Sequence, residues 1–195
     1  MPRSAEATRA RILETAYDLF YRQGFARVGV DRVAASAGIT KRTLYAHFPS
    51  KDALLEAVLE RHHGLALDRI RRWGDGLSGD LDSWLDALFE ALGRWAATPR
   101  WTGAGFTRLA MELADLPGHP ARAIARRHKA AVEAWLAAEL ARRGVESPAA
   151  RARELQLLLE GSQSLMLIHG DRTIAPAAAM AAKRLVTVGT QRRRR

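Results

Sequence analysis

Cysteine and asparagine are both absent from this chain of 195 residues. Without cysteine there can be no disulfide and no thiolate metal site. Without asparagine there is no acceptor for N-linked glycosylation. Long hydrophobic runs are missing as well: no stretch approaches the roughly 20 apolar residues of a membrane-spanning helix. Residues 1–15 do not resemble a signal peptide. We therefore expect a soluble, cytoplasmic protein that has no membrane partner.

The sequence also lacks the motifs of common catalytic centres. It contains no His-Glu-x-x-His zinc helix, no phosphate-binding loop and no Gly-x-Ser-x-Gly nucleophile elbow. Glu60 and His63 have the spacing of a di-iron bundle, but the second copy and the further carboxylates are missing. His62 and His63 are adjacent, so they point in different directions on a helix and make a poor metal pair. We predict neither an enzyme nor a bound cofactor or metal.

The excess positive charge lies at the two ends of the chain. The formal net charge is +10, and residues 1–51 alone have nine Lys or Arg against four Asp or Glu. The tail Arg192–Arg195 adds four cations, whereas residues 52–191 are almost neutral, with eighteen bases and seventeen acids. A nucleic-acid-binding N-terminal region followed by a nearly neutral domain predicts this distribution, because phosphate contacts need a local cluster of cations.

Residues 29–48 have the pattern of two short helices joined by a glycine turn. The first helix has one apolar face at helical spacing, and Gly38 supplies the left-handed residue that ends it. Thr40 is a suitable N-cap for the second helix, in which Leu44 faces inward. This pattern favours a helix-turn-helix with a DNA-recognition helix. An ordinary helical corner with solvated basic residues would give the same pattern.

Cations lie on the free face of the second helix and just beyond it. Lys41, Arg42 and Tyr45 fall within one arc of that helix. Ser50 is the expected N-cap of the next helix, which places Lys51 in its first turn, where a cation opposes the helix dipole. A bound phosphate would reconcile the two, because helix N-termini and lysines both favour anions. The alternative is a solvated lysine that tolerates a small penalty.

The order of residues in this region resembles the motif of TetR-family transcriptional regulators. The resemblance extends without a gap from about Thr8 to Leu55. It implies an all-helical homodimer, with a three-helix DNA-binding domain followed by a divergent ligand-binding and dimerisation domain. Most members are repressors that a small molecule releases from DNA. The segments that carry the resemblance are Ala34-x-x-Ala37-Gly38-Ile39-Thr40, Thr43-Leu44-Tyr45-Ala46-His47-Phe48 and Ser50-Lys51-Asp52-Ala53-Leu54-Leu55.

Two positions depart from the family pattern. Gly29 stands where a Ser or Thr usually caps the helix and can touch phosphate, so that contact is in doubt. Arg42 replaces what is often a small residue and could add a contact to guanine. By resemblance, the residues at positions that contact DNA in the family are Thr40, Lys41, Arg42, Thr43, Tyr45, His47 and Lys51.

We predict an all-α fold, because no stretch alternates with the period of a strand. An N-terminal three-helix domain with the helix-turn-helix would occupy residues 1–50, and a helical ligand-binding and dimerisation domain residues 51–191. The basic tail, residues 192–195, would follow. Expected helices are 4–23, the two short helices within about 29–48, one from Ser50 to about Trp73, 81–97, about 103–115, 120–143, 148–169 and about 175–188.

Aromatic and methionine side chains recur in the predicted second domain. They could line a ligand cavity, although such residues at helical spacing also form an ordinary core. A neutral domain rich in Trp and Leu would suit a hydrophobic or aromatic effector. The candidate pocket residues are Trp84, Phe89, Trp95, Trp101, Phe106, Met111, Met166 and His169.

The last two predicted helices are candidates for a dimer interface. Residues 148–169 have an apolar stripe wide enough for two partners, and the helix after them is rich in alanine, which lets helices approach closely. The resemblance implies that these helices, about 148–188, pair across a twofold axis to form a homodimer. The alternative is that both belong only to the core of one chain.

The predicted function is a sequence-specific DNA-binding regulator, most simply a repressor released by an unknown small-molecule effector. Two recognition helices would enter successive major grooves, about 34 Å or a multiple of it apart, on near-palindromic double-stranded DNA. Two other classes stay open: a helical binding protein that does not touch DNA, and a binder without sequence preference that depends on the arginine tail. Sequence specificity separates the three.

Overall fold

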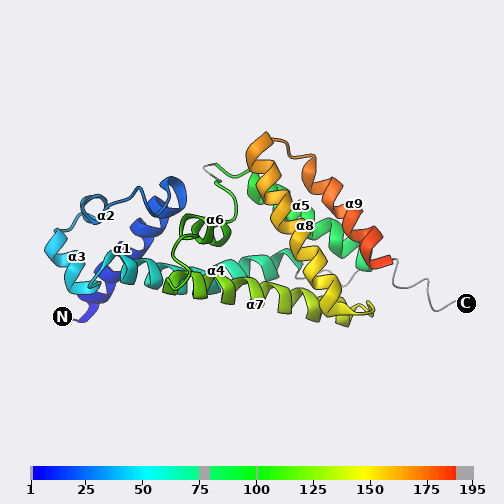
Figure 1. Cartoon of the computed structure of the whole chain (residues 1–195), viewed down its shortest axis with the longest axis horizontal. Helices are drawn as coiled ribbons and strands as arrows, with labels where there is room; N and C mark the ends of the chain where they lie inside the picture. The colour runs from blue at the N-terminus through cyan, green and yellow to red at the C-terminus, as the bar shows by residue number, and fades with distance from the viewer. Residues whose placement is uncertain (1, 75–79, 100, 188–195) are drawn as a thin grey trace, which may run out of the picture. The chain divides into compact units, whose positions relative to one another are not determined.

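The computed structural model describes residues 2–74, 80–99 and 101–187, and every regular element in these ranges is an α-helix (Figure 1). The predicted all-α fold is therefore confirmed for this part of the chain. None of the described helices is long and apolar enough to cross a bilayer. The predicted basic tail lies outside the described residues. The helices are α1 (Pro2–Gln23), α2 (Val30–Ser36), α3 (Lys41–His47), α4 (Lys51–Gly74), α5 (Leu81–Ala96), α6 (Gly105–Glu112), α7 (Pro120–Arg142), α8 (Pro148–His169) and α9 (Ile174–Thr187).

The helices form two compact units. Unit 1 contains residues 1–65 and 105–127, and unit 2 contains residues 66–104 and 128–195. Helices α4 and α7 each contribute residues to both units. Unit 1 is larger than the predicted DNA-binding domain, residues 1–50, since α6 and the start of α7 pack with the N-terminal helices. The functional boundary at residue 50 stays a prediction.

The apolar faces of α1–α4 build the core of unit 1. Helix α1 buries a stripe at helical spacing, and Phe20 near its end meets Phe25 edge-on, with the ring centroids 5.3 Å apart. Leu44 of α3 is fully buried in this core, which fixes the face that α3 turns outward. The other buried side chains are Ile12, Leu13, Ala16, Leu19, Val28, Val33, Ala34, Ala37, Phe48, Leu54, Leu55, Val58 and Leu59.

A tight turn after α1 is held against α6 by one carboxylate. Gly24 ends α1 with a φ of +87°, a conformation that only glycine adopts without strain. A Cβ placed there would lie 2.9 Å from Oε1 of Glu112. The backbone N–H of Ala26 donates a hydrogen bond to Oε2 of Glu112, at 3.1 Å. This turn therefore needs glycine for its backbone and for the approach of α6.

Replacing Gly24 by alanine should lower the free energy of unfolding by about 1–2 kcal/mol, because the left-handed conformation is strained for any residue with a Cβ. The new methyl group would also push the Glu112 carboxylate away. Thermal or urea unfolding of the full chain measures the effect. Gly64→Ala is the matched control, since Gly64 lies inside α4 with open space around it and alanine favours a helix. Equal stability of both variants would contradict this explanation.

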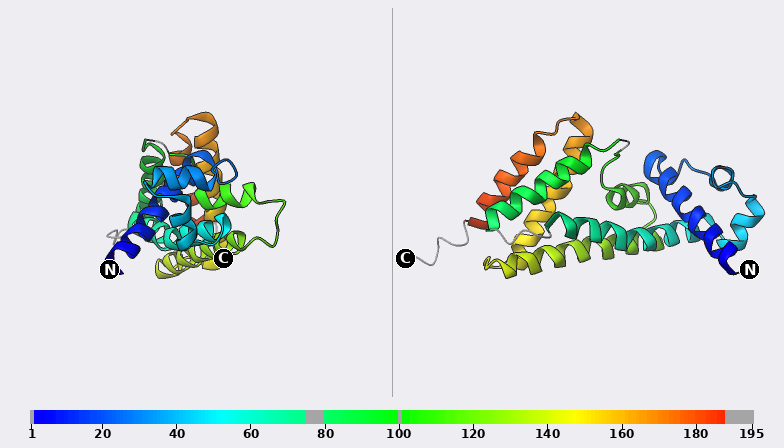
Figure 2. Two further views of the ribbon diagram at one scale, coloured as in Figure 1. Left: turned by 90° about the vertical axis from the view of Figure 1, so that its left-hand side faces the viewer. Right: turned by 180° about the vertical axis from the view of Figure 1, so that it is seen from behind.

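Unit 2 is built around α5, which packs against α8 and α9 (Figure 2, right). Trp84 and Phe89 of α5 are fully buried. The small residues of α9 allow close approach, and a Cβ on Gly93 would lie 3.4 Å from the Cβ of Ala175. Further core residues of unit 2 are Leu85, Leu88, Leu92, Val132, Leu136, Leu140, Ala152, Leu155, Leu159, Met166, Ala178, Ala179, Ala182 and Val186.

The helices predicted from the sequence are present, with one clear difference in length. The helix expected over about 103–115 covers only Gly105–Glu112. Gly103 has a φ of +83°, which prevents an earlier start, and residues 113–115 form a turn. Apolar spacing continued through that turn, so periodicity alone extended the helix too far.

Candidate nucleic-acid interface

The turn between α2 and α3 fixes the geometry of the candidate site. Helix α2 ends at Ser36, and Gly38 follows with a φ of +64°. The N–H of Ile39 returns to the carbonyl of Ala34 at 3.0 Å and closes the turn. Thr40 then caps α3, as predicted, because its Oγ1 accepts the N–H of Thr43 at 3.1 Å. The two helices are therefore held at a fixed angle by local hydrogen bonds.

Helix α3 separates a buried side from a polar, exposed side. Leu44 is fully buried, whereas Lys41 and Arg42 are exposed and Tyr45 has 42% of its surface accessible. An exposed tyrosine on the same helix as two exposed cations has no role in the core of unit 1, so its ring is available to a partner. The face that the sequence predicted to point outward is exposed in this unit.

The two other predicted contacts on α3, Thr43 and His47, are half-buried, whereas the cap residue Thr40 is exposed. The hydroxyl of Thr43 lies 2.9 Å from the hydroxyl of Thr40, so the two share a hydrogen bond at the start of the helix. His47 is half-buried at the end of α3, with its ring centroid 6.4 Å from that of Phe48. These residues position α3, and they also border its exposed face.

Lys41 forms an ion pair that the sequence did not predict. Its Nζ lies 2.9 Å from one carboxylate oxygen of Asp31 and donates a hydrogen bond of 3.1 Å to the other. This hydrogen bond raises the pKa of Lys41 above its usual value, so the ammonium stays charged. Both groups are exposed, where such a pair contributes little and salt screens it. The ammonium can therefore exchange Asp31 for an incoming phosphate.

Lys51 lies in the first turn of α4, as the sequence predicted. The Oγ of Ser50 accepts the N–H of Ala53 at 3.0 Å and caps the helix. The Nζ of Lys51 lies 4.1 Å from the ring centroid of Phe25, a cation–π contact that holds the side chain over the core. Partial burial lowers the pKa of Lys51, while nearby Asp52 and Glu112 oppose this change. The Lys51 ammonium thus lies over Phe25, at the start of a helix whose N-terminus Ser50 caps.

Sequence reasoning missed two side-chain contacts near this surface. Asp31 orients Lys41, and the guanidinium of Arg9 lies over the ring of Phe48, with its Cζ 5.1 Å from the centroid. The first contact joins α2 to α3, and the second joins α1 to the residue that follows α3. Helical periodicity shows which residues share a face but not which residue of a neighbouring helix meets them, so no feature of the sequence identified these pairs.

The structure divides the predicted pocket residues between the two units. Trp84, Phe89 and Met166 are buried in the core of unit 2. Trp95 and Trp101 are half-buried in the same unit, with ring centroids 5.8 Å apart, and His169 is exposed at the end of α8. Phe106 and Met111 belong to unit 1, where Phe106 is buried and Met111 is 69% exposed. Their role as ligand contacts stays a prediction.

No group of three or more His, Cys, Asp and Glu side chains that could hold a metal occurs among the described residues. Glu60, part of the weak di-iron pattern, instead forms an ion pair with Arg127 in unit 1.

Helix α3 is anchored in a buried core and exposes two cations and a tyrosine. Two short helices arranged in this way define a helix-turn-helix nucleic-acid-binding module. The profile described as "Bacterial regulatory proteins, tetR family" matches residues 12–58. The chain belongs to the TetR family of bacterial regulators.

Comparison with curated proteins gives matches that are confined to part of each chain. SrpR, an HTH-type transcriptional regulator of Pseudomonas putida, is 43% identical over 65 residues, which cover 33% of this chain and 30% of SrpR. UidR, an HTH-type transcriptional regulator of Escherichia coli, is 36% identical over 77 residues, or 40% of this chain and 39% of UidR. The chain thus spans well under half the length of these two relatives. Both are described as HTH-type transcriptional regulators.

Solved structures match over almost the whole chain. A TetR-family regulator from Streptomyces coelicolor has a TM-score of 0.83 and 25% identity, covering 94% of this chain and 96% of its own. A TetR-type regulator from Streptomyces avermitilis has a TM-score of 0.81 and 28% identity, covering 93% and 97%. The arrangement of an N-terminal helix-turn-helix and a helical C-terminal part is therefore that of the family.

Proposed function

We propose that the protein is a sequence-specific DNA-binding transcriptional regulator, a homodimeric repressor that a small molecule releases from its operator. The observation that carries this proposal is α3: Leu44 anchors it in the core, while Lys41, Arg42 and Tyr45 stay exposed. A short helix of this kind enters the major groove and reads base edges. We also propose a cytoplasmic location, because the proposed partner is DNA.

The seven candidate residues divide into base contacts and phosphate contacts. Arg42 can donate two hydrogen bonds to guanine, while Lys51 and the amides of the first turn of α4 hold a backbone phosphate. Lys41 reaches phosphate or a base once it leaves Asp31. Gly29 caps α2 without a side-chain hydrogen bond, so it offers only its backbone. The residues assigned to base contacts or to positioning α3 are Thr40, Thr43, Tyr45 and His47.

An exposed apolar face of α8 and α9 supports the proposed homodimer. Leu157, Leu165 and Ile168 of α8 are 69%, 45% and 72% exposed, and Met180 of α9 is 56% exposed. The exposed positions of α8 between Leu157 and Ile168 carry no charge. A surface of this composition favours burial against a second apolar surface, and a twofold axis supplies an identical one.

Unit 2 also offers a place for the proposed effector. The rings of Trp73 and Trp101 lie 5.7 and 5.8 Å from that of Trp95, so three half-buried indoles gather in one cluster. The Nε1 of Trp101 is buried without a hydrogen-bond partner among the described residues. Buried donors are normally paired, and a ligand acceptor would pair this one. We therefore propose a hydrophobic or aromatic effector with one acceptor group.

A salt-dependence experiment tests the DNA contact of Lys51. We expect Lys51→Ala to make the slope of log K against log salt shallower by roughly one unit, since one neutralised phosphate releases about one counterion. Fluorescence anisotropy with DNA from upstream of the protein's own gene measures the slope in excess non-specific competitor. Arg72→Ala, an exposed arginine of α4 in unit 2, is the control and should leave the slope unchanged. Identical slopes for wild type and Lys51→Ala would remove Lys51 from the interface.

A further inference from the structure

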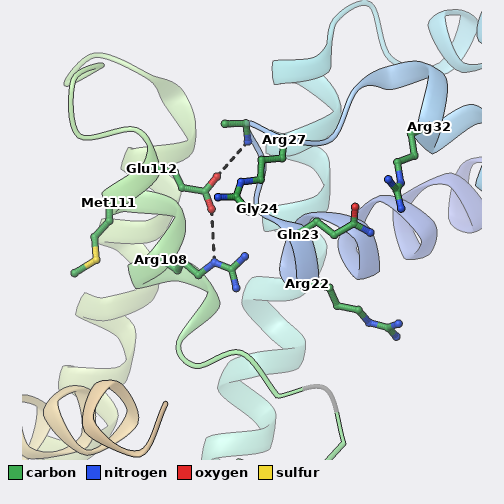
Figure 3. A pocket seen from close by; sticks show the side chains of 9 residues that line it. Arg22, Gln23, Gly24, Arg27, Arg32, Arg108, Met111 and Glu112 are labelled. Carbon is green, nitrogen blue, oxygen red and sulfur yellow. Dashed lines mark hydrogen bonds and ion pairs between the residues drawn. The ribbon is translucent and has the colours of Figure 1, made fainter. Parts of the chain in front are cut away.

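A cleft of about 850 Å³ opens in unit 1, on the side of α6 (Figure 3). It is formed by the end of α1, the turn that follows, α2 and α6. None of the seven predicted DNA contacts lines it. Its lining residues are Arg22, Gln23, Gly24, Ala26, Arg27, Arg32, Arg108, Met111 and Glu112.

The lining is strongly cationic. Its lining contains four arginines and a single carboxylate, that of Glu112. Arg22 forms an ion pair with Asp18 within α1, and the Nε of Arg108 lies 3.6 Å from Glu112. Arg27 and Arg32 are exposed, and no carboxylate of the described residues lies within ion-pairing distance of either. Two guanidinium groups with five donors each are therefore available to an anion.

Glu112 shows which chemistry the cleft binds. Its carboxylate accepts the backbone N–H of Ala26 and lies against Arg108, both drawn as dashed lines in Figure 3. A carboxylate from the protein thus already uses one backbone donor and one guanidinium. Charge-assisted hydrogen bonds of this kind are the stronger ones, and arginine forms them equally well with carboxylate and phosphate. In Figure 3 the Arg27 side chain points toward the side of Glu112, whereas Arg32 lies apart from both, so guanidinium groups line the cleft on two sides.

We propose that this cleft is a binding site for a small molecule with two or more carboxylate or phosphate groups. One group would bind Arg32, and a second would bind Arg27 and compete with Glu112 for Arg108 and the N–H of Ala26. The volume lies within the range of small-molecule sites. Release of Glu112 would free α6 from the turn that leads into α2. Anion binding and the release of Glu112 do not rest on the proposed function, because neither needs DNA; only an effect on DNA binding would rest on it.

Calorimetric titration of the full chain with pyrophosphate, and separately with citrate, tests the site without DNA. We expect saturable binding with a Kd below about 1 mM. The double variant Arg27→Gln, Arg32→Gln should bind at least about tenfold more weakly, because each guanidinium supplies charge-assisted hydrogen bonds. The double variant Arg72→Gln, Arg126→Gln removes the same charge from exposed positions outside the cleft. It should bind within about twofold of wild type.

Glu112→Gln separates a ligand site from a structural contact. Glutamine keeps an acceptor for Ala26 and removes the only negative charge of the lining, so pyrophosphate should bind several-fold more tightly. No saturable binding to wild type would overturn the proposal. Equal loss in both double-arginine variants would reduce the effect to net charge and would also overturn it.

A DNA phosphate could use the same arginines, and a second measurement distinguishes it. We expect the cleft double variant, Arg27→Gln, Arg32→Gln, to bind operator DNA like the control double variant, Arg72→Gln, Arg126→Gln. Without added anion, the affinity and the salt slope of the two variants should be close. A shallower slope without loss of pyrophosphate binding would assign the arginines to the DNA backbone and overturn the small-molecule site.

Discussion

The double variant Leu165→Glu, Ile168→Glu should be a monomer. The exposed apolar side chains of α8 would be replaced by two carboxylates in each protomer, and a twofold axis would bring all four together. Like charges in an otherwise apolar interface cost several times more than they do in water. Operator affinity should fall by at least about 100-fold, since the two heads would no longer bind as one linked pair.

Sedimentation velocity and fluorescence anisotropy together measure this effect. Because both side chains are exposed in the single chain, helicity and unit stability should stay close to wild type, which circular dichroism checks. Leu116→Glu is the matched control, as Leu116 is 49% exposed but lies in the turn between α6 and α7. A double variant that remains dimeric would show that α8 does not form the interface.

Replacing Trp84 by alanine should destabilise the protein by about 3–5 kcal/mol, the usual cost of emptying an aromatic core position. Trp84 is fully buried, its ring centroid lies 6.1 Å from that of Trp135, and the guanidinium of Arg143 lies over it at 4.5 Å. A Cβ on Gly74 would meet its Nε1 at 2.7 Å.

Urea unfolding at one fixed protein concentration measures the Trp84 effect, because dimerisation would otherwise change the apparent stability. Leu116→Ala, at an exposed position, should change stability by less than about 0.5 kcal/mol. If Trp84→Ala were as stable as this control, Trp84 would line an open cavity rather than the core. That outcome would favour the ligand-pocket interpretation made from the sequence.

The candidate DNA-binding surface was largely predictable because its determinants are local. The turn at Gly38, the cap at Thr40 and the inward Leu44 lie within seven residues of one another, and each follows from backbone chemistry or helical periodicity. The cap at Ser50 and the position of Lys51 follow in the same way. A short, strongly patterned segment therefore specifies both its fold and its exposed face.

Contacts between distant segments were not predictable from the same rules. Glu112 meets Ala26 across 86 positions of sequence, and this contact brings α6 into unit 1. Phe106 and Met111 thereby leave the unit that holds the other six candidate pocket residues. Apolar residues at helical spacing show that one face of a helix will be buried. Many other apolar faces in this chain could have packed against that face. The pattern does not choose among them.

Selection from random double-stranded DNA with the full-length protein tests the central claim most directly. It should be run near physiological salt with excess non-specific competitor, since affinities depend steeply on salt. We expect a near-palindromic motif, with half-sites about one helical turn or a multiple of it apart, that wild type enriches and Tyr45→Ala enriches weakly. Failure to enrich any motif, or equal enrichment by Tyr45→Ala and wild type, would contradict sequence-specific recognition through α3.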